Sequence, residues 1–74
     1  MMITVSEAMR LGLCPAELRA ADGEIIDRLV TAFDMRSGAV ESYITDDKGN
    51  FVHGAGEIRR RVEVFPAPLT MIVK

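Results

Sequence analysis

The spacing of the apolar residues changes near residue 38, and this change is the strongest constraint on the fold. Before it, apolar residues recur with the spacing of one helix face, and polar residues fill the opposite face. The five apolar positions are Ile25, Ile26, Leu29, Val30 and Phe33. After it, apolar and polar residues alternate with the period of a half-buried strand. The sequence therefore predicts a helical first part, including a helix from about Glu24 to Met35, followed by a sheet.

The start of the chain carries signals for two shorter helices. Thr4 and Glu7 have the spacing of a capping box, in which each side chain accepts a hydrogen bond from a backbone donor at the helix start. Gly12 can adopt the left-handed conformation that ends a helix, so the first helix is expected to stop just before it. Pro15 suits the first turn of a new helix, because its missing N–H would have no helical partner there. This pattern predicts a second helix from Pro15 to about Ala21.

Turn residues divide the alternating second part into strands. Asp46–Asn50 is a polar turn within a β-hairpin. Gly54-Ala55-Gly56 is expected to break or bulge the ladder, and Pro66-Ala67-Pro68 ends the longest strand. The expected strands cover residues 39–45, 51–53, 58–65 and 69–73. The predicted fold is a single α+β domain over residues 1–74, with two or three N-terminal helices packed on a C-terminal three- to four-stranded antiparallel sheet.

The composition is that of a small globular protein. A chain of 74 residues builds only a thin core, so self-association is an open source of further burial. Cys14 is the only cysteine, which excludes an internal disulfide and a zinc site of several thiolates. No apolar run reaches the length of about 18 residues that a membrane span needs. These features favour a soluble, cytoplasmic protein without a membrane partner, which either occupies a reducing compartment or is indifferent to redox conditions.

Positive charge is concentrated at one place, Arg59-Arg60-Arg61, although the formal net charge is −2. On a strand, Arg59 and Arg61 point to one face and Arg60 to the other. Four residues of the first face form the predicted interaction surface: Glu57, Arg59, Arg61 and Glu63. The alternative is a solvated face on which the acids neutralise the arginines. Arg60 shares the apolar side with Ile58 and Val62, so we expect it to be structural: its charge extends to solvent, sits at the sheet edge or pairs with an acid.

No pattern of residues indicates catalysis. The sequence contains no recognisable set of acid, base, nucleophile and oxyanion donors, and a chain this short has little room for a lined pocket of the usual size. His53 is the only histidine, so a metal site or triad built on it would need further members that no motif supplies. We therefore expect a non-enzymatic protein with no catalytic residue, cofactor or metal ion.

A small residue, a glycine and two leucines give the stretch from Thr4 to Arg19 the spacing of a helical corner: Ala8, Gly12, Leu13 and Leu18. This stretch resembles the helix-turn-helix of small bacterial and phage regulators, most nearly the start of the MerR-like winged group. The resemblance implies that Glu17 and Arg19 lie on the helix that reads DNA. Residues 1–38 carry six acids against four bases, however, and an acidic surface is repelled by DNA phosphates. A helical corner without DNA is therefore the preferred interpretation.

As a very short, compact, acidic chain, the protein is also similar to small phage-encoded accessory proteins, including inhibitors of host defence or transcription. This similarity implies that its partner is another protein. We predict a small protein-interaction or regulatory protein, in the specific form of an inhibitor of a host system. Two alternatives stay open, namely a helix-turn-helix DNA-binding regulator and a small structural subunit that donates an edge strand to a neighbour.

Overall fold

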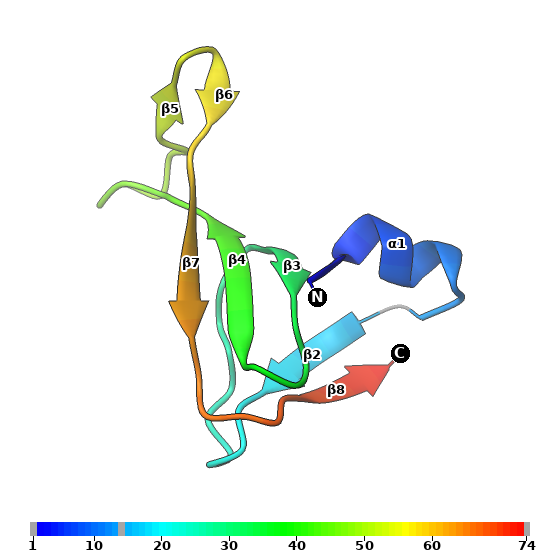
Figure 1. The fold of residues 1–74 in the computed structure, drawn as a ribbon. Helices are drawn as coiled ribbons and strands as arrows, with labels where there is room; N and C mark the ends of the chain where they lie inside the picture. The colour runs from blue at the N-terminus through cyan, green and yellow to red at the C-terminus, as the bar shows by residue number, and fades with distance from the viewer. Residues whose placement is uncertain (1, 14, 74) are drawn as a thin grey trace.

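The computed structural model describes residues 2–13 and 15–73, and within these ranges the chain is mostly strands (Figure 1). Cys14, on which the expected compartment depends, lies outside the described residues. The elements are β1 (Ile3–Thr4), α1 (Val5–Arg10), β2 (Pro15–Arg19), β3 (Val30–Phe33), β4 (Ala39–Tyr43), β5 (His53–Gly54), β6 (Glu57–Ile58), β7 (Arg60–Val64) and β8 (Thr70–Val73). The predicted α+β arrangement of two or three helices on a sheet is wrong, because α1 is the one helix in the described ranges. None of the described residues forms a helix with the length and apolarity that crossing a membrane requires.

The first predicted helix is confirmed as α1. The Thr4 hydroxyl accepts a hydrogen bond from the Glu7 amide at 3.0 Å, and the Glu7 carboxylate accepts one from the Thr4 amide at 3.3 Å. Gly12 has φ +82°, as expected for the residue that closes the helix. Ala8 is fully buried and anchors the helix against the strands.

The capping box makes a testable contribution to stability. Replacing Thr4 with alanine removes the acceptor for the Glu7 amide, so we expect the free energy of unfolding to fall by about 1 kcal/mol. Urea denaturation measures the loss, and Ser6→Ala in the same helix is the control, because Ser6 is exposed and is not the cap. Equal effects of the two substitutions would show that the cap does not stabilise the helix.

The second predicted helix is wrong, since residues 15–19 form strand β2. This strand pairs antiparallel with β8, with Leu18 opposite Met71 and Arg19 opposite Thr70. Proline is as compatible with the first residue of a strand as with the first turn of a helix, so the local signal at Pro15 was ambiguous. Pairing with β8 buries Leu18 in the core. The described residues therefore form no helix-turn-helix, and DNA binding by this chain stays untested.

The predicted helix from Glu24 to Met35 is also wrong. Its second half forms β3, and the turn that follows joins β3 to β4, with the Asp34 amide bonded to the Ala39 carbonyl at 2.8 Å. The five apolar residues do not share one buried face: Phe33 is 1% and Ile26 6% exposed, but Leu29 is 51% exposed. Three of the five are β-branched, and β-branched side chains favour strands over helices. That preference and the pairing with β4 outweigh the helical spacing.

The main sheet has four antiparallel strands in the order β1-β3-β4-β7. Val40, the second residue of β4, lies opposite Phe33 on β3 and Glu63 on β7. Figure 1 shows the β2–β8 pair crossing below this sheet, with α1 to one side. The buried cluster between them consists of Ala8, Leu18, Ile26, Phe33, Val40 and Leu69. The core is therefore made by non-local contacts between both halves of the chain.

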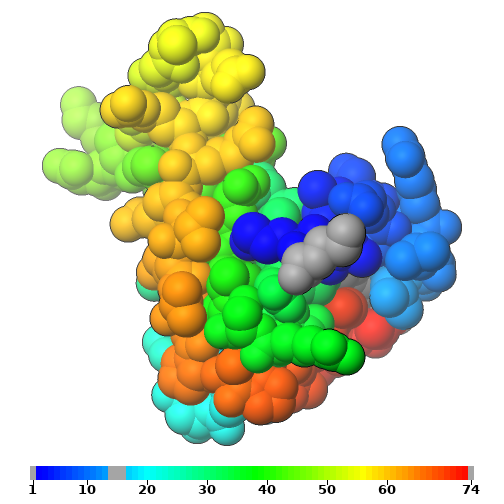
Figure 2. Space-filling view, viewed as in Figure 1, coloured from blue at the N-terminus to red at the C-terminus, as the bar shows by residue number. Residues whose placement is uncertain are grey.

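The predicted turns of the second half are mostly confirmed. The Asp46 amide bonds to the Asn50 carbonyl at 2.8 Å, and the Asp46 carboxylate accepts from the Lys48 and Asn50 amides, which closes the expected hairpin. Gly54-Ala55-Gly56 is not a break or bulge but the tight turn between β5 and β6, with positive φ at Ala55 and Gly56. This small hairpin stands out from the body of the molecule (Figure 2).

The long predicted strand over residues 58–65 is interrupted at Arg59, between β6 and β7. The face of this strand that was predicted to be apolar, with Val62 and Val64, points away from the core. Val62 is 58% and Val64 75% exposed, because β7 is the last strand of the sheet and these residues lie opposite Glu41 and Ala39, on the face away from the core. The opposite face of β7 carries Arg61 and Glu63, across from the buried Ser42 and Val40.

Candidate interaction groove

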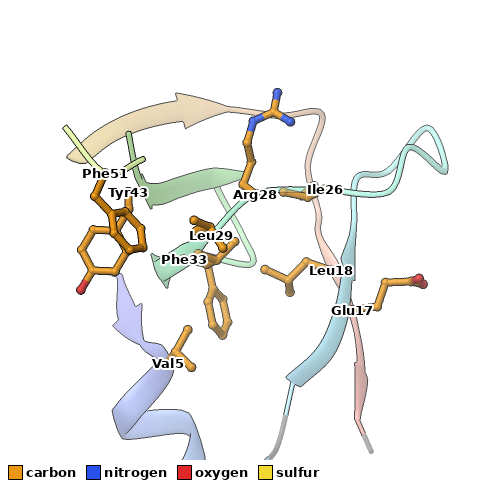
Figure 3. Close-up of a pocket in the computed structure, with 10 residues that line it drawn as sticks. Val5, Glu17, Leu18, Ile26, Arg28, Leu29, Phe33, Tyr43 and Phe51 are labelled. Carbon is orange, nitrogen blue, oxygen red and sulfur yellow. The ribbon is translucent and has the colours of Figure 1, made fainter. Parts of the chain in front are cut away.

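An apolar groove opens between the main sheet and β2 (Figure 3). Its volume is about 450 Å³. Ten residues line it: Val5, Glu17, Leu18, Ile26, Arg28, Leu29, Val30, Phe33, Tyr43 and Phe51. They come from α1, β2, β3, β4 and two connecting segments, so the groove exists only in the folded chain.

The groove has buried residues on its inner side and exposed apolar residues at its opening. Phe33, Leu18 and Ile26 belong to the core cluster. Leu29 and Phe51 are 51% and 44% exposed. Figure 3 places the Phe51 ring against Tyr43, and the two rings meet edge to face with centroids 5.6 Å apart. Apolar surface thus continues from the core out to solvent.

Backbone hydrogen bonds hold the segment that carries Leu29. The Ile26 amide donates to the Leu18 carbonyl at 2.9 Å, which ties the segment to β2. The Tyr43 amide donates to the Leu29 carbonyl at 3.1 Å, which ties it to β4. Because both ends are fixed, the Leu29 side chain is held at the opening although half of it is exposed.

The two charged residues of the lining are each paired with another side chain. The Arg28 Nε donates to Glu63 Oε1 at 3.0 Å, and the Arg28 guanidinium lies 5.9 Å from the centre of the Phe65 ring. The hydrogen bond and the charge of Glu63 raise the pKa of Arg28, so the guanidinium stays protonated. Glu17 accepts a hydrogen bond from Arg19 at 2.6 Å. In Figure 3 both charged groups point away from the apolar side chains, which leaves the groove itself apolar.

The pair Glu17 and Arg19, assigned to DNA reading by the helix-turn-helix resemblance, lies on strand β2 rather than on a helix. Each side chain is engaged by the other, and β2 is covered along one edge by β8. No recognition helix places these residues in a major groove. The helix on which the resemblance placed them is absent from the described residues, and a role of this pair in DNA binding stays untested.

The four residues of the predicted interaction surface lie on β6, on β7 and at Arg59 between these two strands. Glu57 lies on β6, and Arg59 follows it with its side chain across Gly54, where a Cβ would come within 2.9 Å of the Arg59 Nε. Arg61 and Glu63 lie together on β7, with Arg61 Nε 4.0 Å from Glu63 Oε1. The structure thus brings Arg61 and Glu63 together, and their role in binding stays a prediction.

Arg60 behaves as expected for a structural residue. Its Nη1 lies 3.7 Å from Glu41 Oε1, and its guanidinium lies 5.9 Å from the centre of the Tyr43 ring. The Glu41 carboxylate also accepts a hydrogen bond from Thr31 at 2.7 Å. Pairing with an acid, one of the three arrangements considered, is present, and it occurs on the exposed side of the sheet.

Within the part of the chain that the structure describes, no cluster of three or more histidine, cysteine, aspartate or glutamate side chains could hold a metal ion.

No protein-family model matches the sequence, and the searches of curated proteins and of solved structures find no match either. Sequence reasoning missed the groove, because Leu29 was placed in the core and Phe51 was assigned only to a strand.

Proposed function

We propose that this chain is a non-enzymatic protein-interaction module whose groove receives a large apolar side chain of a partner protein. The observation that carries the proposal is the continuity of apolar surface from the core residue Phe33 to the exposed Leu29 and Phe51. Exposed apolar surface with charged residues at its margin is typical of interaction sites. Aromatic residues and arginine, here Tyr43 and Arg28, are also enriched at protein interfaces.

A protein fits this groove better than a small ligand does. Sites for small molecules enclose most of the ligand surface. Here two of the lining side chains, Leu29 and Phe51, remain about half exposed, so much of the apolar surface lies outside the cavity. A partner that inserts one side chain and lays its backbone across the opening would cover both parts. The more specific role of an inhibitor of a host system rests on resemblance alone and stays a prediction.

Selection from a library of random peptides displayed against the full chain tests this proposal. We expect the selected peptides to share at least one large apolar residue. Leu29→Arg should weaken the best peptide by about thirtyfold, because a central apolar contact is worth about 2 kcal/mol or more. Isothermal titration calorimetry measures the change.

Leu11→Arg is the matched control. Leu11 is 71% exposed and does not line the groove, so the same substitution there should leave peptide affinity unchanged. Equal weakening by both substitutions would show that the added charge, not the groove, is responsible. Selection of peptides without apolar residues, or binding of an apolar dye such as anilinonaphthalene sulfonate with no peptide selected, would contradict the proposal.

A further inference from the structure

Strand β7 leaves one backbone edge without a partner strand in the described part of the chain, because it is the last strand of the main sheet. The Phe65 amide donates to the Gly38 carbonyl, and the Ile44 amide donates to the Arg59 carbonyl. Hydrogen-bonded pairs alternate along an antiparallel ladder. The odd-numbered residues therefore bond to β4, and the amides and carbonyls of the even-numbered ones point outward. These outward residues are Arg60, Val62 and Val64.

We propose that this edge pairs with β7 of a second copy of the chain, in antiparallel register about a two-fold axis at Val62. In this register Val62 faces Val62 of the second copy, and Arg60 faces Val64. All three pairs are of the hydrogen-bonded type, which uses every outward amide and carbonyl of the strand. The two four-stranded sheets would then join into one continuous sheet.

Charge selects this register over its neighbours. With the axis at Val62, Arg61 of each copy lies directly opposite Glu63 of the other, and opposite charges across an antiparallel pair are stabilising. An axis at Arg61 would place two arginines opposite each other, and an axis at Glu63 would place two glutamates opposite each other. Both of these registers are destabilised by like charges.

The exposed valines and the small core also favour a second copy. Val62 and Val64 are 58% and 75% exposed on the last strand of the sheet, and an edge strand is a ready template for pairing with another chain. Three of the eight buried apolar residues in the described ranges are alanines, namely Ala8, Ala20 and Ala32. Small cores of this kind gain burial by association. The inference goes beyond the proposed function, because no residue of β7 lines the groove.

Sedimentation velocity on the full chain tests the pairing. We expect wild-type protein to form a species of twice the 8.1 kDa chain mass. Arg61→Glu alone and Glu63→Arg alone should each weaken the dimer by about tenfold or more, because each places like charges opposite each other twice. An equimolar mixture of the two variants should dimerise again, since every opposed pair is then complementary.

Two further variants keep the test independent of folding. Val62→Pro removes an outward amide and no bond to β4, so it should abolish the dimer while the circular dichroism spectrum is retained. Lys48→Glu makes the same change of charge as Arg61→Glu in the turn over residues 46–50 and should leave the dimer intact. A wild-type protein that stays monomeric at its highest soluble concentration, or a variant mixture that fails to dimerise, would overturn the proposal. Peptide binding by Val62→Pro tests the groove separately.

Discussion

Replacing Phe33 with alanine is expected to lower the free energy of unfolding by about 3–5 kcal/mol, the usual loss for a fully buried phenylalanine. Phe33 is 1% exposed, lies opposite Ile3 and Val40 on the neighbouring strands, and belongs to the core cluster. A protein of this size has a total stability of only about 4–11 kcal/mol. The substitution should therefore remove much of that stability, measured by urea denaturation at equilibrium.

Leu29→Ala is the control that separates this fold from a helix over residues 24–35. Such a helix would bury Leu29 and Phe33 on one face, and the two alanine substitutions would cost similar amounts. In the observed fold Leu29 is half exposed, so its replacement should cost less than about 1.5 kcal/mol. A loss at Leu29 as large as the loss at Phe33 would restore the helical interpretation.

Gly38→Ala is expected to be the second most damaging substitution, with a loss of about 3 kcal/mol or more from backbone strain and overpacking. Gly38 has φ +81°, a conformation that side chains other than glycine rarely adopt. A Cβ at this position would also meet the carbonyl oxygen of Phe65. The Gly38 carbonyl accepts the Phe65 amide at 2.9 Å. The clash therefore falls at the start of β4, where β4 begins to pair with the end of β7.

Gly49→Ala separates the two contributions to this loss. Gly49 has the same φ of +81°, but no atom lies within 4 Å of the Cβ that alanine would add. Alanine at position 49 should therefore lower the free energy of unfolding only through the strain of the left-handed conformation, by about 1 kcal/mol. Thermal unfolding followed by circular dichroism compares the two variants. Equal losses would mean that the approach of Phe65 to Gly38 is not close.

The elements that the sequence predicted correctly are those with signals inside a few residues. Thr4, Glu7 and Gly12 define both ends of α1 without help from distant residues. The turn at Asp46–Asn50 and the prolines after β7 likewise mark the neighbouring strands. Capping and turn chemistry act locally, so such signals hold in almost any tertiary context.

The predictions that were wrong concern segments whose conformation depends on distant partners. Residues 15–19 form a strand because β8, more than fifty residues later, pairs with them. Residues 30–33 form a strand because β1 and β4 lie on either side. The β-branched pairs Ile25-Ile26 and Val30-Thr31 were a usable signal against a helix. The spacing of the apolar residues, taken alone, favoured a helix over a strand.

The groove could not be predicted from the sequence for the same reason. Leu18, Leu29 and Phe51 come from three separate segments and converge only when β2 and β4 are in place. The arginine cluster was visible in the sequence, but alternation along one long strand placed Arg59 and Arg61 together. The strand assignment is interrupted at Arg59, whose side chain lies across Gly54, and Arg61 lies near Glu63.

An NMR measurement on the complex with the strongest selected peptide tests the central claim, that the groove binds an apolar side chain of a protein partner. With isotope-labelled protein and unlabelled peptide, we expect intermolecular nuclear Overhauser effects from the apolar peptide side chain to the Leu29 methyl groups and the Phe51 ring. Contacts to Leu18 would show insertion down to the core residues. Effects confined to β7, or to the exposed residues Met9 in α1 and Leu11 directly after it, would contradict the account.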